Sequence, residues 1–338
     1  HVLFGTPDIS GRPDYDLERW AKEKTLEDIR RSRISKRSKD FRQFRKTGYG
    51  FRDMMKAIEA AKPSSIITST WTYSFGTNQI FSPGAFGISQ ETPTVDISME
   101  DFGLLYRLSK NGQKPTVNIN VQSKELGKVP TYNSLARIEG TEKSDEYVIL
   151  SAHLDTTGGG TGATDNGTGT ITMMEVMRIL KKIYPNPKRT IIAAHWGAEE
   201  QGLNGSSAFV EDNPEIVENL QALFNQDNGT GRVAKINGHG FTEAYRFIGQ
   251  WLEYVPSEIK DEIQTTFPGV PIPRYEYEEN GVTVPAGGSS DWRNFVSSGV
   301  PGFNLSSLDF SYGGYSPYHY TWHTNRDTYD KIIFDDVR

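Results

Sequence analysis

The chain has 338 residues, of which 36% are hydrophobic and 24% are charged, so it can bury a sizeable core and extended disorder is not expected. The formal net charge of −6 argues against nucleic acid as the main partner, and the absence of cysteine excludes disulfides, thiolate metal ligands and a cysteine nucleophile. No run of about 18 apolar residues is present, so the sequence predicts no transmembrane helix.

The N-terminal side of the chain predicts short elements separated by polar segments. The expected elements are a helix over 52–61, a strand over 65–69, a long loop over 72–93 and a helix over 99–111. Residues 30–46 are rich in lysine and arginine, which is typical of a solvated helical face or a linker. We therefore expect a basic segment over 1–50 and a small β/α region over 51–113.

Beyond residue 114 the pattern changes to apolar strands that alternate with helices. Strands are expected at 117–121, 134–138, 147–152, 190–194, 222–224 and 302–305, and helices at 168–183 and 242–254. The strand at 147–152 is nearly all apolar and is predicted to be central. This alternation predicts an α/β domain over 114–338, with a mostly parallel mixed sheet covered by helices on both faces.

Side chains that bind metals follow several of these strands, at or just after the strand ends. They are His153, Asp165, the pair Glu199 and Glu200, Asp227 and His323. Open α/β sheets gather ligands in the crevice beyond the carboxyl ends of their strands. Imidazoles and carboxylates in these numbers suffice for a pair of divalent ions bridged by one carboxylate, with positions left for water.

His153 and Asp155 end a predicted strand two residues apart, so their side chains point the same way. A ligating histidine usually donates its second ring N–H to an acceptor, and Asp155 is placed to be that acceptor. A surface pair without a metal is the competing interpretation.

The glycine-rich segment 157–169 also matches the spacing of a dinucleotide loop through Gly158, Gly160 and Ala163. Asp165 near the following helix start would repel a pyrophosphate. The alternative is a loop that brings Asp165 to a metal. As the carboxylate between the two strand-end ligands, Asp165 is then the natural bridge between two ions.

Glu199 and Glu200 are adjacent and point apart, so they cannot share one role. One is expected to bind metal and the other to act as general base, unless the pair is a solvated acidic turn. His195 is expected to be a packed histidine. Of the two late histidines, His323 is the expected ligand, and Asp327 is a candidate for supporting it.

In this order the segments resemble the co-catalytic zinc exopeptidases, a family that includes secreted aminopeptidases, carboxypeptidase Q and glutamate carboxypeptidase II. The resemblance rests on Ala152-His-Leu-Asp155, Gly162-Ala-Thr-Asp-Asn-Gly-Thr-Gly169, Glu199-Glu-Gln-Gly-Leu-Asn-Gly-Ser206, Asp227 and Trp322-His-Thr-Asn-Arg-Asp-Thr328. Gly287-Gly-Ser-Ser-Asp291 resembles the later substrate-site segment of the family. Residues 51–113 resemble the later half of a protease-associated domain.

The resemblance implies a peptide substrate, two Zn²⁺ ions and hydrolysis of terminal peptide bonds, as in an aminopeptidase or dipeptidase. It implies that His153 and Asp227 bind one ion, that Glu200 and His323 bind the other, that Asp165 bridges them, that Glu199 is the general base and that Asp155 supports His153. Cobalt or manganese would suit the same oxygen and nitrogen ligands.

Other functions remain open from the sequence. They are a carboxypeptidase of the glutamate type, a glutaminyl cyclase-like enzyme with one zinc ion, a binding module without catalysis and a nicotinamide-dependent oxidoreductase. The first residues lack a recognisable signal segment. We interpret the chain as a processed or partial one, with secretion or a periplasmic location expected and a homodimer as one possible assembly.

Overall fold

The structure is a computed structural model of the chain. It describes residues 2–4, 22–25, 51–69, 92–122, 124, 126–157, 159–227, 229–239, 244–261, 263–266, 276–279, 282–285, 290–307 and 321–337. The chain divides into two compact units. The first comprises residues 1–128, 157–159 and 311–326, and the second comprises 129–156, 160–310 and 327–338.

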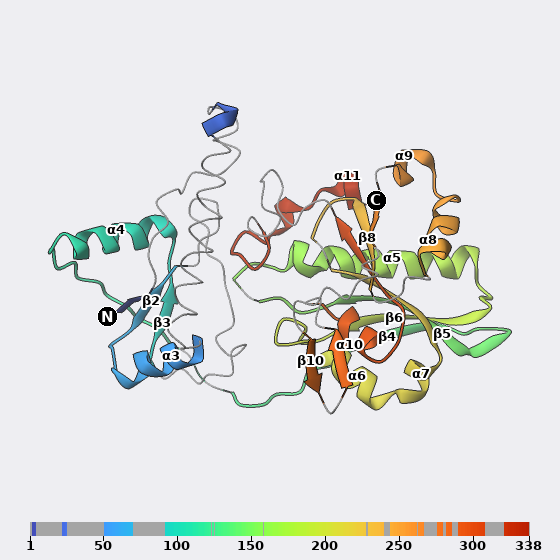
Figure 1. The fold of residues 1–338 in the computed structure, drawn as a ribbon, viewed down its shortest axis with the longest axis horizontal. Coiled ribbons are helices and arrows are strands. Elements are labelled where there is room, and N and C mark those ends of the chain that lie inside the picture. Colours follow the sequence, from blue (N-terminus) through green and yellow to red (C-terminus); the bar gives the residue numbers. More distant parts are fainter. Residues whose placement is uncertain are drawn as a thin grey trace. The chain divides into compact units, whose positions relative to one another are not determined.

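The first unit contains a three-stranded parallel sheet. Its strands are β1 (Val2–Phe4), β2 (Ile66–Thr68) and β3 (Thr94–Asp96), in that order. In the view of Figure 1, α4 (Met99–Lys110) lies above the strands and α3 (Phe51–Ala60) below them. The Ser98 hydroxyl caps α4 by accepting the Asp101 amide, and Gly112 follows the helix with a left-handed φ of 77°.

The second unit is built around a seven-stranded sheet in the order β4-β6-β5-β7-β12-β8-β9. The strands are β4 (Ser134–Ile138), β5 (Lys143–His153), β6 (Arg189–Trp196), β7 (Leu220–Gln226), β8 (Val233–His239), β9 (Gln264–Thr266) and β12 (Gly302–Ser307). The neighbours β6, β5, β7 and β12 run parallel, whereas β4 and β8 run antiparallel to β6 and β12. This confirms the predicted mostly parallel mixed sheet with β5 in a central position.

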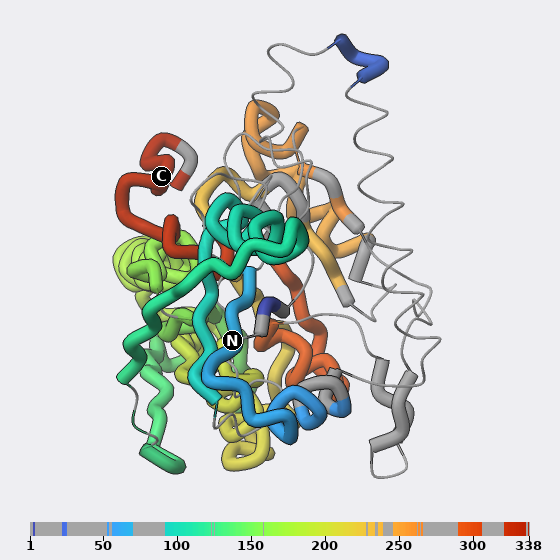
Figure 2. Tube along the Cα trace, turned by 90° about the vertical axis from the view of Figure 1, so that its left-hand side faces the viewer, coloured from blue at the N-terminus to red at the C-terminus, as the bar shows by residue number. Residues whose placement is uncertain are grey.

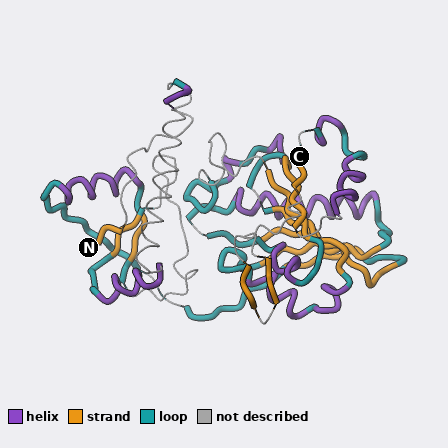
Figure 3. Tube along the Cα trace, viewed as in Figure 1, coloured by secondary structure: helices purple, strands orange, loops and turns teal. Residues whose placement is uncertain are grey.

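Helices cover both faces of this sheet, as Figures 1 and 3 show. The helices are α5 (Thr168–Ile183), α6 (Asn204–Asp212), α7 (Pro214–Glu218), α8 (Ala244–Leu252), α9 (Ser257–Lys260), α10 (Trp292–Ser297) and α11 (Phe334–Val337). A π-helical turn over Ala163–Gly167 precedes α5, a 3₁₀ turn spans Tyr329–Lys331, and β10 (Glu276–Glu279) pairs with β11 (Val282–Pro285) as a separate hairpin. Figure 2 views α5 nearly along its axis.

The two faces carry separate apolar clusters. Leu223 and Phe224 are successive residues of β7 and therefore point to opposite faces. Leu223 belongs to the larger cluster, with residues of α6, α7 and α10, whereas Phe224 packs with Phe303 and with Ile248 of α8.

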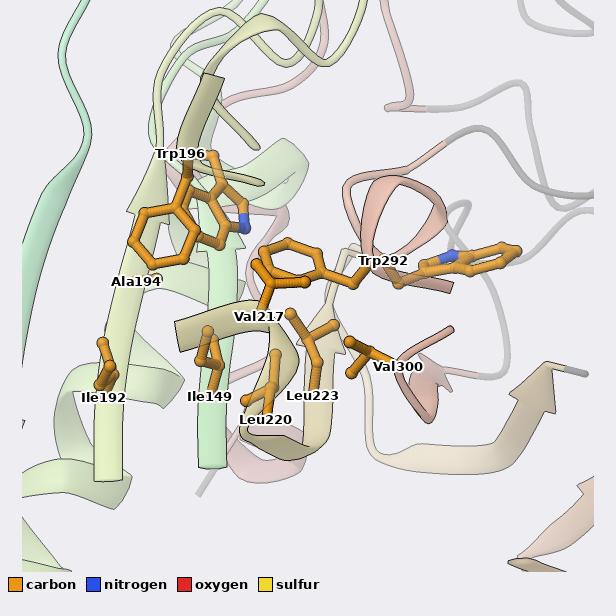
Figure 4. Packing of buried hydrophobic residues seen from close by; sticks show 11 residues of the cluster. Ile149, Ile192, Ala194, Trp196, Val217, Leu220, Leu223, Trp292 and Val300 are labelled. Atoms are coloured by element: carbon orange, nitrogen blue, oxygen red, sulfur yellow. The ribbon is translucent and has the colours of Figure 1, made fainter. Parts of the chain in front are cut away.

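The larger cluster lies under the strand ends at which the candidate site begins. Figure 4 shows Ile192, Ala194 and Trp196 along one face of β6, beside Ile149 of β5. The Trp196 ring lies 5.2 Å from that of Phe209 and 5.6 Å from that of Phe295, measured between centroids. Burial of each such side chain contributes roughly 1.5–3 kcal/mol. This packing fixes the ends of β5 and β6.

One predicted element is wrong. Residues 113–122 form no strand, although Val117 and Ile119 are half-buried as the alternation suggested. Alternating apolar residues make a strand only where a neighbouring strand offers hydrogen bonds, and within the described part of the chain none pairs with this segment. By contrast, β4 and α5 have the bounds predicted from the sequence.

The expected organisation of the N-terminal side stays a prediction. Most of the segment 1–50 and of the loop 72–93 lies outside the described residues. The compact units separate after residue 128, whereas the sequence suggested a boundary after residue 113. The protease-associated region over 51–113 is likewise untested. Among the helices in the described ranges, none is long and apolar enough to cross a bilayer.

Candidate metal centre

The predicted ligands of the second unit lie at the carboxyl ends of three adjacent parallel strands. His153 is the last residue of β5, Asp227 follows the end of β7, and Glu199 and Glu200 follow the end of β6. Because β6, β5 and β7 are neighbours, their carboxyl ends meet. Sequence order alone did not reveal that β5 lies between the other two strands.

The His153 ring is the centre of the cluster. Its Nε2 lies 3.1 Å from Asp165 Oδ1 and 3.2 Å from Asp227 Oδ1. Ligand atoms of His153, Asp165 and Asp227 all lie within 4.8 Å of one another, and the same holds for His153, Glu199 and Glu200. The structure therefore brings together five of the residues that the sequence singled out.

The opposite nitrogen of the His153 ring is held by the backbone. Nδ1 lies 3.0 Å from the carbonyl oxygen of Asp155, whereas the nearest Asp155 carboxylate oxygen is 3.6 Å away. A carbonyl can only accept, so Nδ1 carries the proton in this contact. In the neutral ring, Nε2 then presents its lone pair toward the oxygens of Asp165 and Asp227, which is the arrangement that a bound cation requires.

The Asp155 carboxylate has a second role that the sequence did not indicate. Its two oxygens accept the backbone amides of Glu199, at 2.9 Å, and of Glu200, at 3.1 Å. Burial tends to raise the pKa of Asp155, but His153 and these two amides outweigh it and lower the pKa. The expected support of His153 by Asp155 stays a prediction. The hydrogen bonds from the Glu199 and Glu200 amides to Asp155 are present in the structure.

Tight backbone turns shape the loop that carries the two glutamates. Ala198 and Leu203 both adopt left-handed conformations, with φ of 55° and 59°, and the Leu203 amide donates to the Glu199 carbonyl. A Cβ at Gly205 would lie 2.4 Å from the Gly197 carbonyl oxygen, so a side chain there would force the loop open. Glycine at 205 therefore permits the turn to close behind Glu199.

The loop that carries Asp165 is tied to the end of β7. The Asn166 side chain donates to the Gln226 carbonyl at 2.8 Å and accepts the Gly169 amide at 3.1 Å. A Cβ on Gly169 would lie 2.4 Å from the Gln226 carbonyl oxygen. The absence of a side chain at Gly169 therefore lets the start of α5 lie against the end of β7.

The buried carboxylates carry a strong electrostatic cost. Burial raises the pKa of Asp165 to about 6, and the charges of Asp227 and Glu200 add to this effect. Burial likewise raises the pKa of Glu199 to about 10, with further contributions from Asp227 and Asp291. Burial opposes protonation of His153, yet the surrounding carboxylates raise its pKa well above the usual value.

This donor set fits divalent cations. Carboxylates converge around one imidazole in a buried position, where their mutual repulsion is relieved either by protonation or by added positive charge. Oxygen and imidazole ligands without thiolates suit zinc and also cobalt or manganese.

His323 lies in the first unit, in the segment 311–326, so its role as a ligand stays a prediction. Its backbone is left-handed, with φ of 53°, and its ring stacks on that of Trp322 with centroids 3.9 Å apart. His195 is buried and its pKa is lowered by burial, in agreement with the expected packed histidine.

A buried polar network beside the cluster was only partly anticipated. Asp291, in the segment noted from the sequence, is fully buried and accepts a hydrogen bond from Ser206 of α6. Burial raises the pKa of Asp291 to about 7. Asn225 joins the network by donating to Ser290 and accepting from Ser151. Asn225 lies inside a strand, and nothing in its sequence context marked it as buried.

Comparison with known proteins found a matching family and similar proteins. Residues 133–337 match the model of peptidase family M28. Carboxypeptidase Q from Bos taurus is 28% identical over 279 residues, which cover 79% of this chain and 52% of that protein. The chain thus spans about half the length of the curated relative it matches.

Solved structures show the same fold. A peptidase M28 precursor from Shewanella amazonensis superposes with a TM-score of 0.63 at 22% identity, covering 81% of this chain and 57% of that chain. A zinc aminopeptidase from Bacillus subtilis gives a TM-score of 0.53 at 20% identity, covering 84% and 63%. At such identities the likeness concerns the fold alone, and it confirms the mixed α/β architecture.

Proposed function

Because the chain belongs to peptidase family M28, we propose that it is a zinc-dependent exopeptidase that cleaves terminal peptide bonds, acting as an aminopeptidase or dipeptidase. The observation that carries this proposal is the convergence of His153, Asp165, Glu199, Glu200 and Asp227 at one sheet edge. The name of the Bacillus subtilis neighbour, a zinc aminopeptidase, is consistent with this choice of metal.

In this proposal His153 and Asp227 would hold one zinc ion, Glu200 and His323 would hold the second, and Asp165 would be shared by the two. The contacts of His153 with both Asp165 and Asp227 support the first ligand group. The role of His323 rests on the resemblance of the segment 322–328 to the family.

When bound, the two ions would polarise the scissile carbonyl and acidify the attacking water. Glu199 then takes a proton from that water and passes it to the leaving amine. Asp155 fixes the peptide of Glu199 through its amide and so aims the carboxylate. Glu199 is buried, which keeps bulk water from competing for its proton.

Charge favours a substrate with a free amino terminus. Within the described residues the site holds the carboxylates of Asp155, Asp165, Glu199, Glu200, Asp227 and Asp291. Two divalent ions would bring four positive charges against up to six negative ones, so no excess positive charge remains to attract a substrate carboxylate. An α-ammonium group is stabilised in such surroundings.

A carboxypeptidase is the second candidate, because the bovine relative is named carboxypeptidase Q. Aminoacyl anilides, free dipeptides and N-acetylated peptides, each assayed with and without a chelator, separate the two. We expect cleavage of substrates with a free amino terminus, loss of activity with chelator and recovery with zinc. Cleavage of N-acetylated peptides alone would favour the carboxypeptidase, and activity that survives metal removal would end the proposal.

Metal content distinguishes a peptidase from a glutaminyl cyclase-like enzyme. We expect about two zinc ions per chain, whereas one ion per chain would favour the cyclase. Secretion or a periplasmic location and a homodimer remain predictions from the sequence.

A further inference from the structure

Asp327 holds the loop that carries Asp165 through its side chain. The Asp327 carboxylate is buried, with 3% of the residue exposed, and accepts the backbone amide of Thr164 at 2.6 Å and that of Asp165 at 3.0 Å. Hydrogen bonds from amides to an ionised carboxylate are stronger than those between neutral groups. One side chain thus fixes two successive peptide units, one of which belongs to the proposed bridging ligand.

The backbone of Asp327 binds the same loop. Its carbonyl oxygen accepts the Thr161 amide at 2.7 Å and the Thr161 hydroxyl at 3.1 Å. Asp327 therefore contacts the loop through both its backbone and its side chain, and the carbonyl contacts hold its Cα close to the amides that the carboxylate accepts.

The loop needs an acceptor from elsewhere in the chain. The first amides of a helical segment have no partner within the helix, and a side chain just before the helix usually accepts them. The residue in that position here is Gly162, which has a left-handed φ of 67° and no side chain to offer. Asp327 performs this capping role from a position far along the sequence.

The same arrangement occurs at the glutamate loop. There the Asp155 carboxylate accepts the amides of Glu199 and Glu200, as the Asp327 carboxylate accepts those of Thr164 and Asp165. In both loops, one buried or half-buried carboxylate accepts two successive backbone amides, and at least one of those amides belongs to a proposed site residue. A purely structural role would not explain why the same arrangement occurs at both loops that carry proposed site residues.

We propose that Asp327 is a positioning residue of the metal centre, which fixes the peptide of Asp165 so that its carboxylate faces His153. This inference rests on the proposed function, because it takes Asp165 as a metal ligand. Since Asp165 bridges both ions in that proposal, loosening its peptide weakens the binding of both rather than of one.

The test is zinc binding to the metal-free full chain, measured by titration calorimetry for Asp327→Asn. Asparagine keeps one acceptor oxygen but turns an NH₂ group toward the second amide. We expect both zinc-binding steps to weaken by about 10- to 100-fold, the range typical for groups that orient metal ligands. Asp327→Ala should weaken them further. Thr161→Val, which removes one contact to the Asp327 carbonyl, should have a smaller effect and serves if the other variants do not fold.

Thr190→Val is the matched control. The Thr190 hydroxyl is fully buried, accepts the Gly140 amide and donates to the Ser144 carbonyl, at the opposite end of β6. This variant should lower the melting temperature and leave zinc affinity at the parental value. Folded Asp327 variants with parental zinc affinity would overturn the positioning role alone. A parent chain that binds no zinc would overturn the proposed function and, with it, this inference.

Discussion

Acidic side chains at the two ends of β5 and β6 have pKa values shifted in opposite directions. At the amino end, Glu146 of β5 pairs with Lys143 and with Arg189 of β6, and these partners lower its pKa although desolvation opposes them. At the carboxyl end, burial raises the pKa of Glu199 to about 10 and that of Asp165 to about 6. The same two strands therefore carry a compensated acid at one end and crowded acids at the other.

From this difference we expect a bound cation to stabilise the carboxyl end of the strands and not the amino end. At the amino end the Glu146 carboxylate has two basic side chains beside it, and water screens the remaining charge. At the carboxyl end the carboxylates are held by backbone amides and by a single imidazole within the second unit. Acids arranged in this way are poised for cations, and the following experiments test that contrast.

The largest expected effect is on catalysis. Glu199→Gln keeps the size of the side chain but removes the base, so kcat should fall by about 10²- to 10⁴-fold. Zinc content, measured by atomic absorption, should remain at the parental level. Glu146→Gln makes the same chemical change at the other end of the strands and should leave kcat unchanged. An active Glu199→Gln enzyme would remove the proposed base.

Zinc should stabilise the folded chain through the carboxyl end. A ligand that binds only the folded state, present at about 1,000 times its Kd, adds about 4 kcal/mol to the free energy of unfolding. We expect a gain of this size on adding zinc to the metal-free chain, measured by urea unfolding. Asp165→Asn should show a much smaller gain. Equal gains in the two proteins would exclude Asp165 from the site.

Removing the charge of Asp291 should change the pH dependence of the metal-free chain. Burial raises the pKa of Asp291 to about 7, so its contribution to stability is fully present at low pH and is lost as pH rises from about 4 to about 7. Relative to Asp291→Asn, the parent should lose on the order of a few kcal/mol over this range, since one pKa unit corresponds to about 1.4 kcal/mol. Parallel stability curves would contradict the buried charge.

The smallest effect is expected at the amino end. The pKa of Glu146 is lowered by Lys143 and Arg189, so its contribution is present above the ordinary value of 4.5 and is lost as pH falls through the folded value. Glu146→Gln should therefore melt slightly below the parent at pH 7 and together with it at acidic pH. A difference that grows on acidification would reverse the sign and refute the pairing.

Elements with strong local signals were predictable from the sequence. The periodicity and flanking residues placed α5 at its observed bounds, and a run of apolar residues identified β5 as central. The strand expected at 117–121 failed because alternation does not supply a partner strand. The strand β8 was missed because it forms by antiparallel backbone pairing with β12, a tertiary contact that its own polar sequence does not indicate.

The candidate site shows the same division. Residue types and order pointed to His153, Asp165, Glu199, Glu200 and Asp227, because ligand chemistry is local to each strand end. The residues that aim these side chains were harder to find. The sequence suggested Asp327 only as a support for His323, yet its carboxylate accepts amides more than 160 positions earlier in the chain. Contacts of that kind depend on how loops fold back, which spacing does not encode.

Gly169 allows a close backbone contact beside the proposed metal ligands Asp165 and Asp227. Its missing side chain lets the start of α5 touch the end of β7, where a Cβ would lie only 2.4 Å from the Gln226 carbonyl oxygen. Asp165 stands just before that helix and Asp227 just after that strand. The close contact at Gly169 therefore brings together the two segments that carry these carboxylates. A larger residue at 169 would push these two segments apart. Position 169 is therefore the one to change in order to adapt the proposed metal site to a larger ion.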